Sequence, residues 1–284
     1  MAQADDAGAR PDLRNVGDLE PTLERARGER WARMAGILYP AGVVALVLVL
    51  WEAGTRLFAV PVFLLPPPTA VAVSFIANAS LLAFDAWITT AEILLGFALS
   101  IVVGIPLALA IFLWPVFSRS ILPLLVSSQA MPKVAVAPLF LVWFGFGLLP
   151  KVLIAFLIAF FPIVINTAVG LASIEAEKIH LARSMGFGAF ATFFKIRLPN
   201  ALPAIFGGLK ISITLAVVGA VVGEFVGGDA GLGYLLMVAN GSMDTQLLFA
   251  GIFALTFLGV VLFLLVEVAE RLAIPRHMIQ RTAE

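Results

Sequence analysis

Side chains that could carry out chemistry are scarce in this sequence of 284 residues, which contains no cysteine and only two histidines, His180 and His277. A thiol nucleophile, a thiolate metal site and a disulfide framework are therefore excluded, and a histidine-based metal site or catalytic triad is disfavoured. No lysine directly follows a glycine, so the phosphate-binding loop that contains Gly-Lys is absent. The sequence predicts no catalytic residue, no metal site and no cofactor.

Two ionisable residues, Glu92 and Lys133, lie inside long apolar segments. Charges are costly in hydrocarbon, so such groups are functional candidates and are expected to have partners. Their opposite charges suggest that these two side chains pair with each other in a helical bundle. Glu224 lies nearer the end of its apolar segment and opens the stretch GEFVGGDAGLGY, which fits either an outer gate or close packing.

Small hydroxyl and amide side chains in the apolar segments could line a polar path for a solute. They can satisfy a solute's hydrogen bonds without a fixed charge, although the same residues also join helices to one another. The candidates for the path or its gate are Gln129, Asn166, Thr167 and Glu224.

The elements that must position these residues are membrane helices. The chain is 61% hydrophobic and 13% charged, which excludes an ordinary soluble globular protein. A span of about 30 Å takes about 20 apolar residues, and six segments of that order are present, at 34–58, 86–113, 121–144, 152–171, 204–226 and 247–272. Pro132 and Pro138 interrupt the third segment, which is expected to be kinked or broken.

The chain is expected to divide into four parts. Residues 1–33 form a mostly disordered polar tail with a short interfacial helix near residues 24–33, and residues 34–84 form the first span and a segment on the outer surface. Residues 85–272 form the main transmembrane domain, and residues 273–284 form a second tail. The tail that precedes the first span is too long and too mixed in charge for a signal peptide.

Positive charges indicate the orientation of the spans. With the amino terminus in the cytoplasm, fifteen of the eighteen lysines and arginines lie on the cytoplasmic side, only Arg56 and Lys151 lie outside, and Lys133 lies within a span. Cytoplasmic loops of membrane proteins carry an excess of Lys and Arg. Both termini and the segment 173–203 are therefore predicted to be cytoplasmic.

The segment 173–203 mixes polar and apolar residues between two apolar runs. Its first part has helical spacing, with Ser173 as the expected cap and Gly186 as a stop that tolerates a left-handed backbone. A second short element covers residues 190–197, and Pro199 and Pro203 are expected to separate it from the next span. This pattern predicts a helix-turn-helix at the membrane surface.

The spacing of Ala182 and Gly186, followed by Ile196-x-Leu198-Pro199, resembles the EAA loop of permease subunits in binding-protein-dependent ABC importers. His180 and Leu181 stand where that loop usually has Glu and Ala. The stretches LPPPTAV, LVWFGFG, FFPIVINT and GEFVGGDAGLGYL are similar to the nitrate, sulfonate, taurine and pyrimidine-precursor branch of the family. The resemblance extends from about Leu65 to Arg271.

The resemblance implies an all-α, six-span permease of the type I importer (MetI-like) fold in the inner membrane, which performs no ATP hydrolysis itself. Its expected partners are two copies of a cytoplasmic ATPase, a periplasmic or lipid-anchored binding protein, a second copy of the chain and the lipid bilayer, with no nucleic acid. The residues implied in docking the ATPase are His180, Leu181, Ala182, Gly186, Ile196, Leu198 and Pro199. The implied substrate is a small organic or inorganic anion or a vitamin precursor such as a pyrimidine.

Two other classes of protein fit the composition less well. A secondary transporter or channel would be expected to have inverted repeats or several paired intramembrane charges, and neither is clear in the sequence. A membrane-embedded enzyme is disfavoured because no His, Cys or paired acidic residues cluster near a membrane surface.

Overall fold

The structure is a computed structural model that describes residues 19–274. These residues form helices and connecting turns without a strand, as predicted for an all-α protein. The α-helices are α1 (Leu19–Leu57), α2 (Pro68–Ala77), α3 (Ala79–Leu113), α4 (Pro115–Ser128), α5 (Ala137–Phe144), α6 (Leu148–Ala172), α7 (Ala176–Ser184), α8 (Ala189–Thr192), α9 (Leu198–Gly227), α10 (Leu232–Gly241) and α11 (Thr245–Ala273). A 3-10 helix, η2 (Lys133–Val136), precedes α5, and a π-helical turn, η3 (Phe193–Arg197), joins α8 to α9.

The chain divides into two compact units, residues 1–61 and residues 62–284. In the first unit, α1 contains an apolar stretch of 20 residues, Leu38–Leu57. Residues 24–33, where a short interfacial helix is expected, lie within α1. The expectations for residues 1–18 and for the tail from residue 275 lie outside the described residues.

Five helical segments of the described chain are long and apolar enough to cross a membrane. They are Leu38–Leu57, Ala79–Leu113, Leu148–Ala172, Ala189–Gly227 and Thr245–Ala273. Pro115–Ser128 and Lys133–Phe144 are long and apolar enough only together, with a bend of 87° between them, and form either a sixth, broken span or a re-entrant loop. The predicted break near Pro132 and Pro138 is therefore confirmed.

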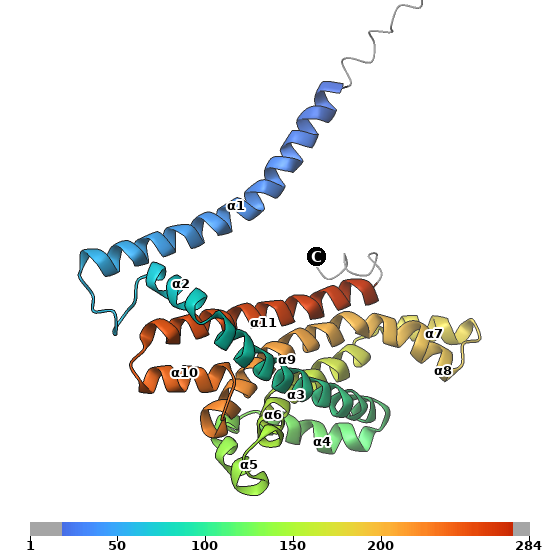
Figure 1. Cartoon of the computed structure of the whole chain (residues 1–284). Coiled ribbons are helices and arrows are strands. Elements are labelled where there is room, and N and C mark those ends of the chain that lie inside the picture. Colours follow the sequence, from blue (N-terminus) through green and yellow to red (C-terminus); the bar gives the residue numbers. More distant parts are fainter. Residues whose placement is uncertain (1–18, 275–284) are drawn as a thin grey trace, which may run out of the picture. The chain divides into compact units, whose positions relative to one another are not determined.

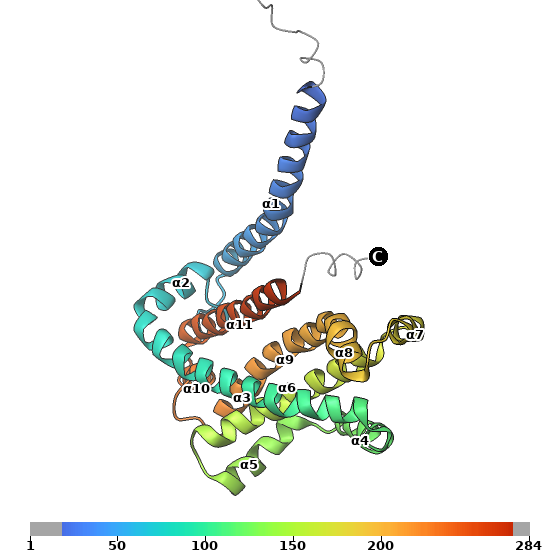
Figure 2. The same cartoon turned by 90° about the vertical axis from the view of Figure 1, so that its right-hand side faces the viewer.

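In the second unit, α6 packs against both α3 and α9 (Figure 1 and Figure 2). Its spanning window is 61% buried, against 28% for α3 and 22% for α11, so α6 is the central helix. Glycines allow this close packing, since a Cβ at Gly219 would lie only 2.5 Å from Cα of Ala155, and one at Gly96 only 2.6 Å from Cβ of Ala155. Small residues at such contacts favour association of helices in a membrane.

Two local predictions around the segment 173–203 are wrong. Ser173 does not cap α7, because its hydroxyl donates backwards to the carbonyl of Gly170 at 2.9 Å and the helix begins at Ala176. Pro199 and Pro203 do not separate the second short element from the span, since residues 189–227 form one helical segment. Pro199 has no N–H to donate, and the π turn η3 changes the hydrogen-bond register directly before it.

Candidate functional site

Helix α7 ends in a glycine turn that reverses the chain before α8. The φ angle of Gly186 is +83°, a left-handed conformation that favours glycine. The N–H of Gly186 donates to the carbonyl of Arg183, and the N–H of Phe187 donates to the carbonyl of Ala182, both at 3.0 Å. These bonds satisfy carbonyls at the end of the helix. The predicted glycine stop and helix-turn-helix are therefore present.

The helix-turn-helix presents large apolar side chains on its surface. Leu181 is 63% exposed, Met185 68% and Phe190 77%. Ala182, in contrast, is only 2% exposed, so the face of α7 that contains it points inward. Within the described residues, the exposed side chains of Leu181, Met185 and Phe190 remain available for contact with a partner.

The other residues expected to dock a partner lie on both sides of the turn. His180 is exposed on α7, and its carbonyl accepts a hydrogen bond from Ser184 at 3.1 Å. Ile196 lies in η3, and Leu198 and Pro199 begin α9; all three are half-buried. Leu198 packs against a core cluster formed by Leu171, Ala201 and Ile205. The start of α9 is therefore fixed to the bundle, whereas His180 and Leu181 lie on the surface.

The three polar path candidates lie on two separate elements. Gln129 is exposed at the end of α4, where the broken span bends. Asn166 is half-buried on α6, and its amide donates to the carbonyl of Pro162 at 2.8 Å. Thr167 is 1% exposed, and its hydroxyl has no hydrogen-bond partner among residues 19–274. Hydrogen bonds between these three residues are absent from the same part of the chain, and their role in a path stays a prediction.

A buried ion pair lies at the end of the bundle opposite α7. Nζ of Lys151, near the start of α6, lies 2.5 Å from Oε1 of Glu92 on α3, and the two side chains are 3% and 0% exposed. The expected pair of Glu92 with Lys133 is therefore wrong. Nζ of Lys133 instead lies 4.3 Å from the centre of the Phe161 ring. Opposite charge alone cannot identify a partner, because the packing of helices decides which side chains meet.

Glu224 belongs to the same buried network and accepts hydrogen bonds from the first turn of α10. It is fully buried near the end of α9, and one carboxylate oxygen accepts a hydrogen bond from the hydroxyl of Thr89 at 2.6 Å. The other oxygen accepts from the backbone N–H groups of Gly233 and Tyr234. A carboxylate at a helix N-terminus is favoured by the helix dipole and satisfies free N–H groups.

Asp85 and Thr89 complete the network on α3. Asp85 accepts from the N–H of Gly231 at 3.0 Å, and Thr89 accepts from the N–H of Leu232 at 2.8 Å. Sequence reasoning missed both residues and also missed the role of Lys151. A signal was available, because the spacing of Asp85, Thr89 and Glu92 places them on one face of a helix. In the described chain, no group of three or more acidic or histidine side chains could hold a metal ion.

Most of the chain is similar in sequence to known transport proteins. Residues 100–277 match the family described as binding-protein-dependent transport system inner membrane component. The chain is 41% identical over 233 residues to the riboflavin transport system permease protein RibX of Chloroflexus aurantiacus, covering 81% of this chain and 86% of that protein. It is 37% identical over 239 residues to the formylaminopyrimidine transport permease protein ThiX of Halalkalibacterium halodurans, covering 84% of this chain and 95% of that protein.

A solved structure has a similar fold. It is a chain from the inward-facing MetNI methionine ABC transporter, with a TM-score of 0.62 and 19% sequence identity. The match covers 70% of this chain and 99% of the other. At this level of identity the likeness concerns the fold alone.

Proposed function

Because this chain belongs to the family of binding-protein-dependent transport system inner membrane components, we propose that its segment 173–203 couples solute transport to a separate ATPase. The chain is the permease subunit of an ATP-driven importer and a multi-pass inner-membrane protein. Its fold is the type I importer permease fold, as predicted.

The observation that carries the coupling role is the exposure of three large apolar side chains of the helix-turn-helix, Leu181, Met185 and Phe190. Apolar side chains on a short helix suit a partner that offers a hydrophobic groove. His180, Ala182, Gly186, Ile196, Leu198 and Pro199 complete the proposed coupling element. Ala182 and Leu198 join it to the bundle, because both contribute to the packing of this end.

The proposed assembly contains two copies of this chain, two ATPase subunits and one binding protein at the outer face. The spanning windows of α3 and α11 are only 28% and 22% buried within a single chain. Their remaining apolar surface suits both lipid and a second copy of the chain. Gln129, Asn166 and Thr167 remain the proposed contributors to the path, and the burial of Glu224 favours a packing role over a gate.

The test of this function is purification of the chain with and without its partners. We expect the chain alone to bind no ATP, because it has no Gly-Lys phosphate loop, and to co-purify with a separate ATPase in equal numbers of copies. Equilibrium binding of labelled ATP and the mass of the purified assembly measure the two outcomes. Stoichiometric binding of nucleotide by the isolated chain would contradict the proposal.

The proposed orientation places both termini and the segment 173–203 in the cytoplasm, on the basis of the asymmetry of positive charge. The natural chain has no cysteine, so single cysteines can be labelled without background. We expect Ala189→Cys to resist a membrane-impermeant maleimide in intact cells and to react once the membrane is opened. Gly241→Cys, at an exposed position with no atom within 4 Å of its Cβ, should react in both. Labelling of Ala189→Cys from outside intact cells would refute this orientation.

The proposed substrate is a small organic solute, either an anion or a vitamin precursor such as a pyrimidine. Support comes from the names of RibX and ThiX, which concern riboflavin and formylaminopyrimidine. In importers of this kind the binding protein makes most of the selection, so calorimetric titration of that partner with pyrimidines and with sulfonates distinguishes the two classes.

A further inference from the structure

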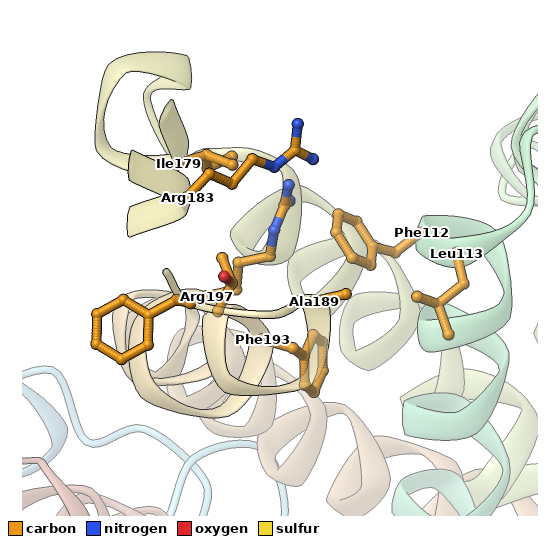
Figure 3. A pocket seen from close by; sticks show the side chains of 9 residues that line it. Phe112, Leu113, Ile179, Arg183, Ala189, Phe193 and Arg197 are labelled. Atoms are coloured by element: carbon orange, nitrogen blue, oxygen red, sulfur yellow. The ribbon is translucent and has the colours of Figure 1, made fainter. Parts of the chain in front are cut away.

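A cavity of about 320 Å³ lies where the end of α3 meets the helix-turn-helix. Phe112 lines it from α3, Arg183 from α7, and Thr192, Phe193 and Arg197 from α8 and η3. Figure 3 shows the side chains of Arg183 and Arg197 converging in the space between α7 and the ring of Phe112. The cavity therefore has aromatic walls and two cations.

The positive charge of this cavity has no acidic counterpart in the described chain. Neither Arg183 nor Arg197 forms an ion pair within residues 19–274, whereas Lys178, Lys210 and Arg271 each pair with a glutamate. The guanidinium of Arg197 lies 4.9 Å from the centre of the Phe112 ring and makes one long hydrogen bond, of 3.5 Å, to the carbonyl of Leu171. Two guanidinium groups that line one cavity without a carboxylate suit a phosphate group.

A second cavity, of about 400 Å³, adjoins the first at Phe112. It lies between α3, α4 and α6, and its lining is almost entirely apolar, with Ile111, Pro115, Leu122 and Val169 among the lining residues. Val169 is 60% exposed, so the cavity borders on the surface of the single chain. A cationic cavity and an apolar cavity that share one wall match the two parts of an amphiphile.

We propose that these two cavities bind one anionic glycerophospholipid, with its phosphate between Arg183 and Arg197 and an acyl chain in the apolar cavity. Basic pockets between membrane helices are suited to anionic headgroups. Both cavities lie at the end of the bundle that carries α7 and α8, which is the cytoplasmic leaflet in the proposed orientation. The lipid would bridge α3 and the helix-turn-helix, so it would hold the coupling element against a span.

The test uses the full chain in detergent, titrated with phosphatidylglycerol or with phosphatidylcholine of the same acyl chains, and read by native mass spectrometry. We expect one tightly held phosphatidylglycerol per chain, at least tenfold preferred over phosphatidylcholine. The double variant Arg183→Gln/Arg197→Gln should lose this preference. The matched control Lys178→Gln/Arg271→Gln changes the net charge by the same amount. Lys178 and Arg271 pair with glutamates and do not line the cavity, so this control should keep the preference for phosphatidylglycerol.

Two further measurements distinguish a bound lipid from a free anion and from a protein partner. Val169→Phe should reduce the affinity for phosphatidylglycerol several-fold while leaving the weak binding of glycerol phosphate unchanged, because it fills only the apolar cavity. Equal affinity for glycerol phosphate and for the lipid would overturn the proposal in favour of a free anion site. Loss of dimer or ATPase association in the double arginine variant, with lipid binding unchanged, would overturn it in favour of a protein partner.

Discussion

Replacing Lys151 with methionine is expected to destabilise the bundle by about 3–5 kcal/mol, the usual cost of removing one partner of a buried ion pair. The ammonium group lies 2.5 Å from the carboxylate of Glu92, and the side chains are 3% and 0% exposed. Without it, Glu92 remains buried and interacts with Glu224, a second fully buried carboxyl group. The loss of stability is measured by thermal unfolding of the purified variant, with size-exclusion chromatography of the heated samples as the readout.

Two further variants separate the ion pair from a general effect of the lysine. Lys133→Met is the matched control, because Lys133 contacts the Phe161 ring and forms no ion pair in the described chain; a loss of about 1 kcal/mol is expected. In the double variant Lys151→Met/Glu92→Gln the buried carboxylate is removed together with its cation, and only Asp229, an exposed carboxylate 3.7 Å from the Lys151 ammonium, loses a partner. Part of the stability should therefore return. Wild-type stability of Lys151→Met would show that the pair does not hold the bundle together.

The position of this network suits a role in the proposed coupling as well as in stability. The segment 173–203 joins the end of α6 to the start of α9, while Lys151 and Glu224 lie at the opposite ends of the same two helices. Asp85, Thr89 and Glu92 extend the network to α3. Under the proposed function, helices bonded at one end and connected at the other are expected to transmit a displacement of α7 to the opposite end of the bundle.

The sequence predicts those features that depend on local chemistry. The spans follow from the length of the apolar segments, and the break near Pro132 follows from the proline's missing N–H and its steric clash. The turn at Gly186 follows from the placement of a glycine after an amphipathic stretch. Each of these features is determined by neighbouring residues and needs no knowledge of which helices touch.

Features that depend on helix packing are the ones that sequence reasoning missed. Counting charges along the chain predicts that Lys151 lies at the outer side, but it does not show that the side chain is buried, which follows from the central position of α6. Its pairing with Glu92 depends on the contact between α3 and α6, which glycines such as Gly96 allow. The helix continues through Pro199 directly after the π turn η3, and no residue pattern in the sequence predicts that turn.

A second large effect is expected for Gly186→Arg, which should insert normally but lose transport and ATPase association. At a φ of +83° any side chain is strained, at a cost of about 1–2 kcal/mol, so the turn is expected to open and move α7. The substitution also adds a cation to a helix-turn-helix whose exposed side chains Leu181, Met185 and Phe190 are apolar. A combined loss of 1.4 kcal/mol or more corresponds to at least about tenfold weaker association.

Two variants separate the backbone effect from the charge effect. Gly186→Ala has the strained backbone without the cation, and Gly188→Arg has the cation in the same turn at a φ of −69°, where a side chain meets no strain. Neither glycine has an atom within 4 Å of the position its Cβ would take, so no clash inside the subunit complicates the comparison. We expect both to be milder than Gly186→Arg when uptake and ATPase co-purification are normalised to the amount of chain in the membrane. Normal transport by Gly186→Arg at normal membrane level would mean that the segment 173–203 is not the coupling element.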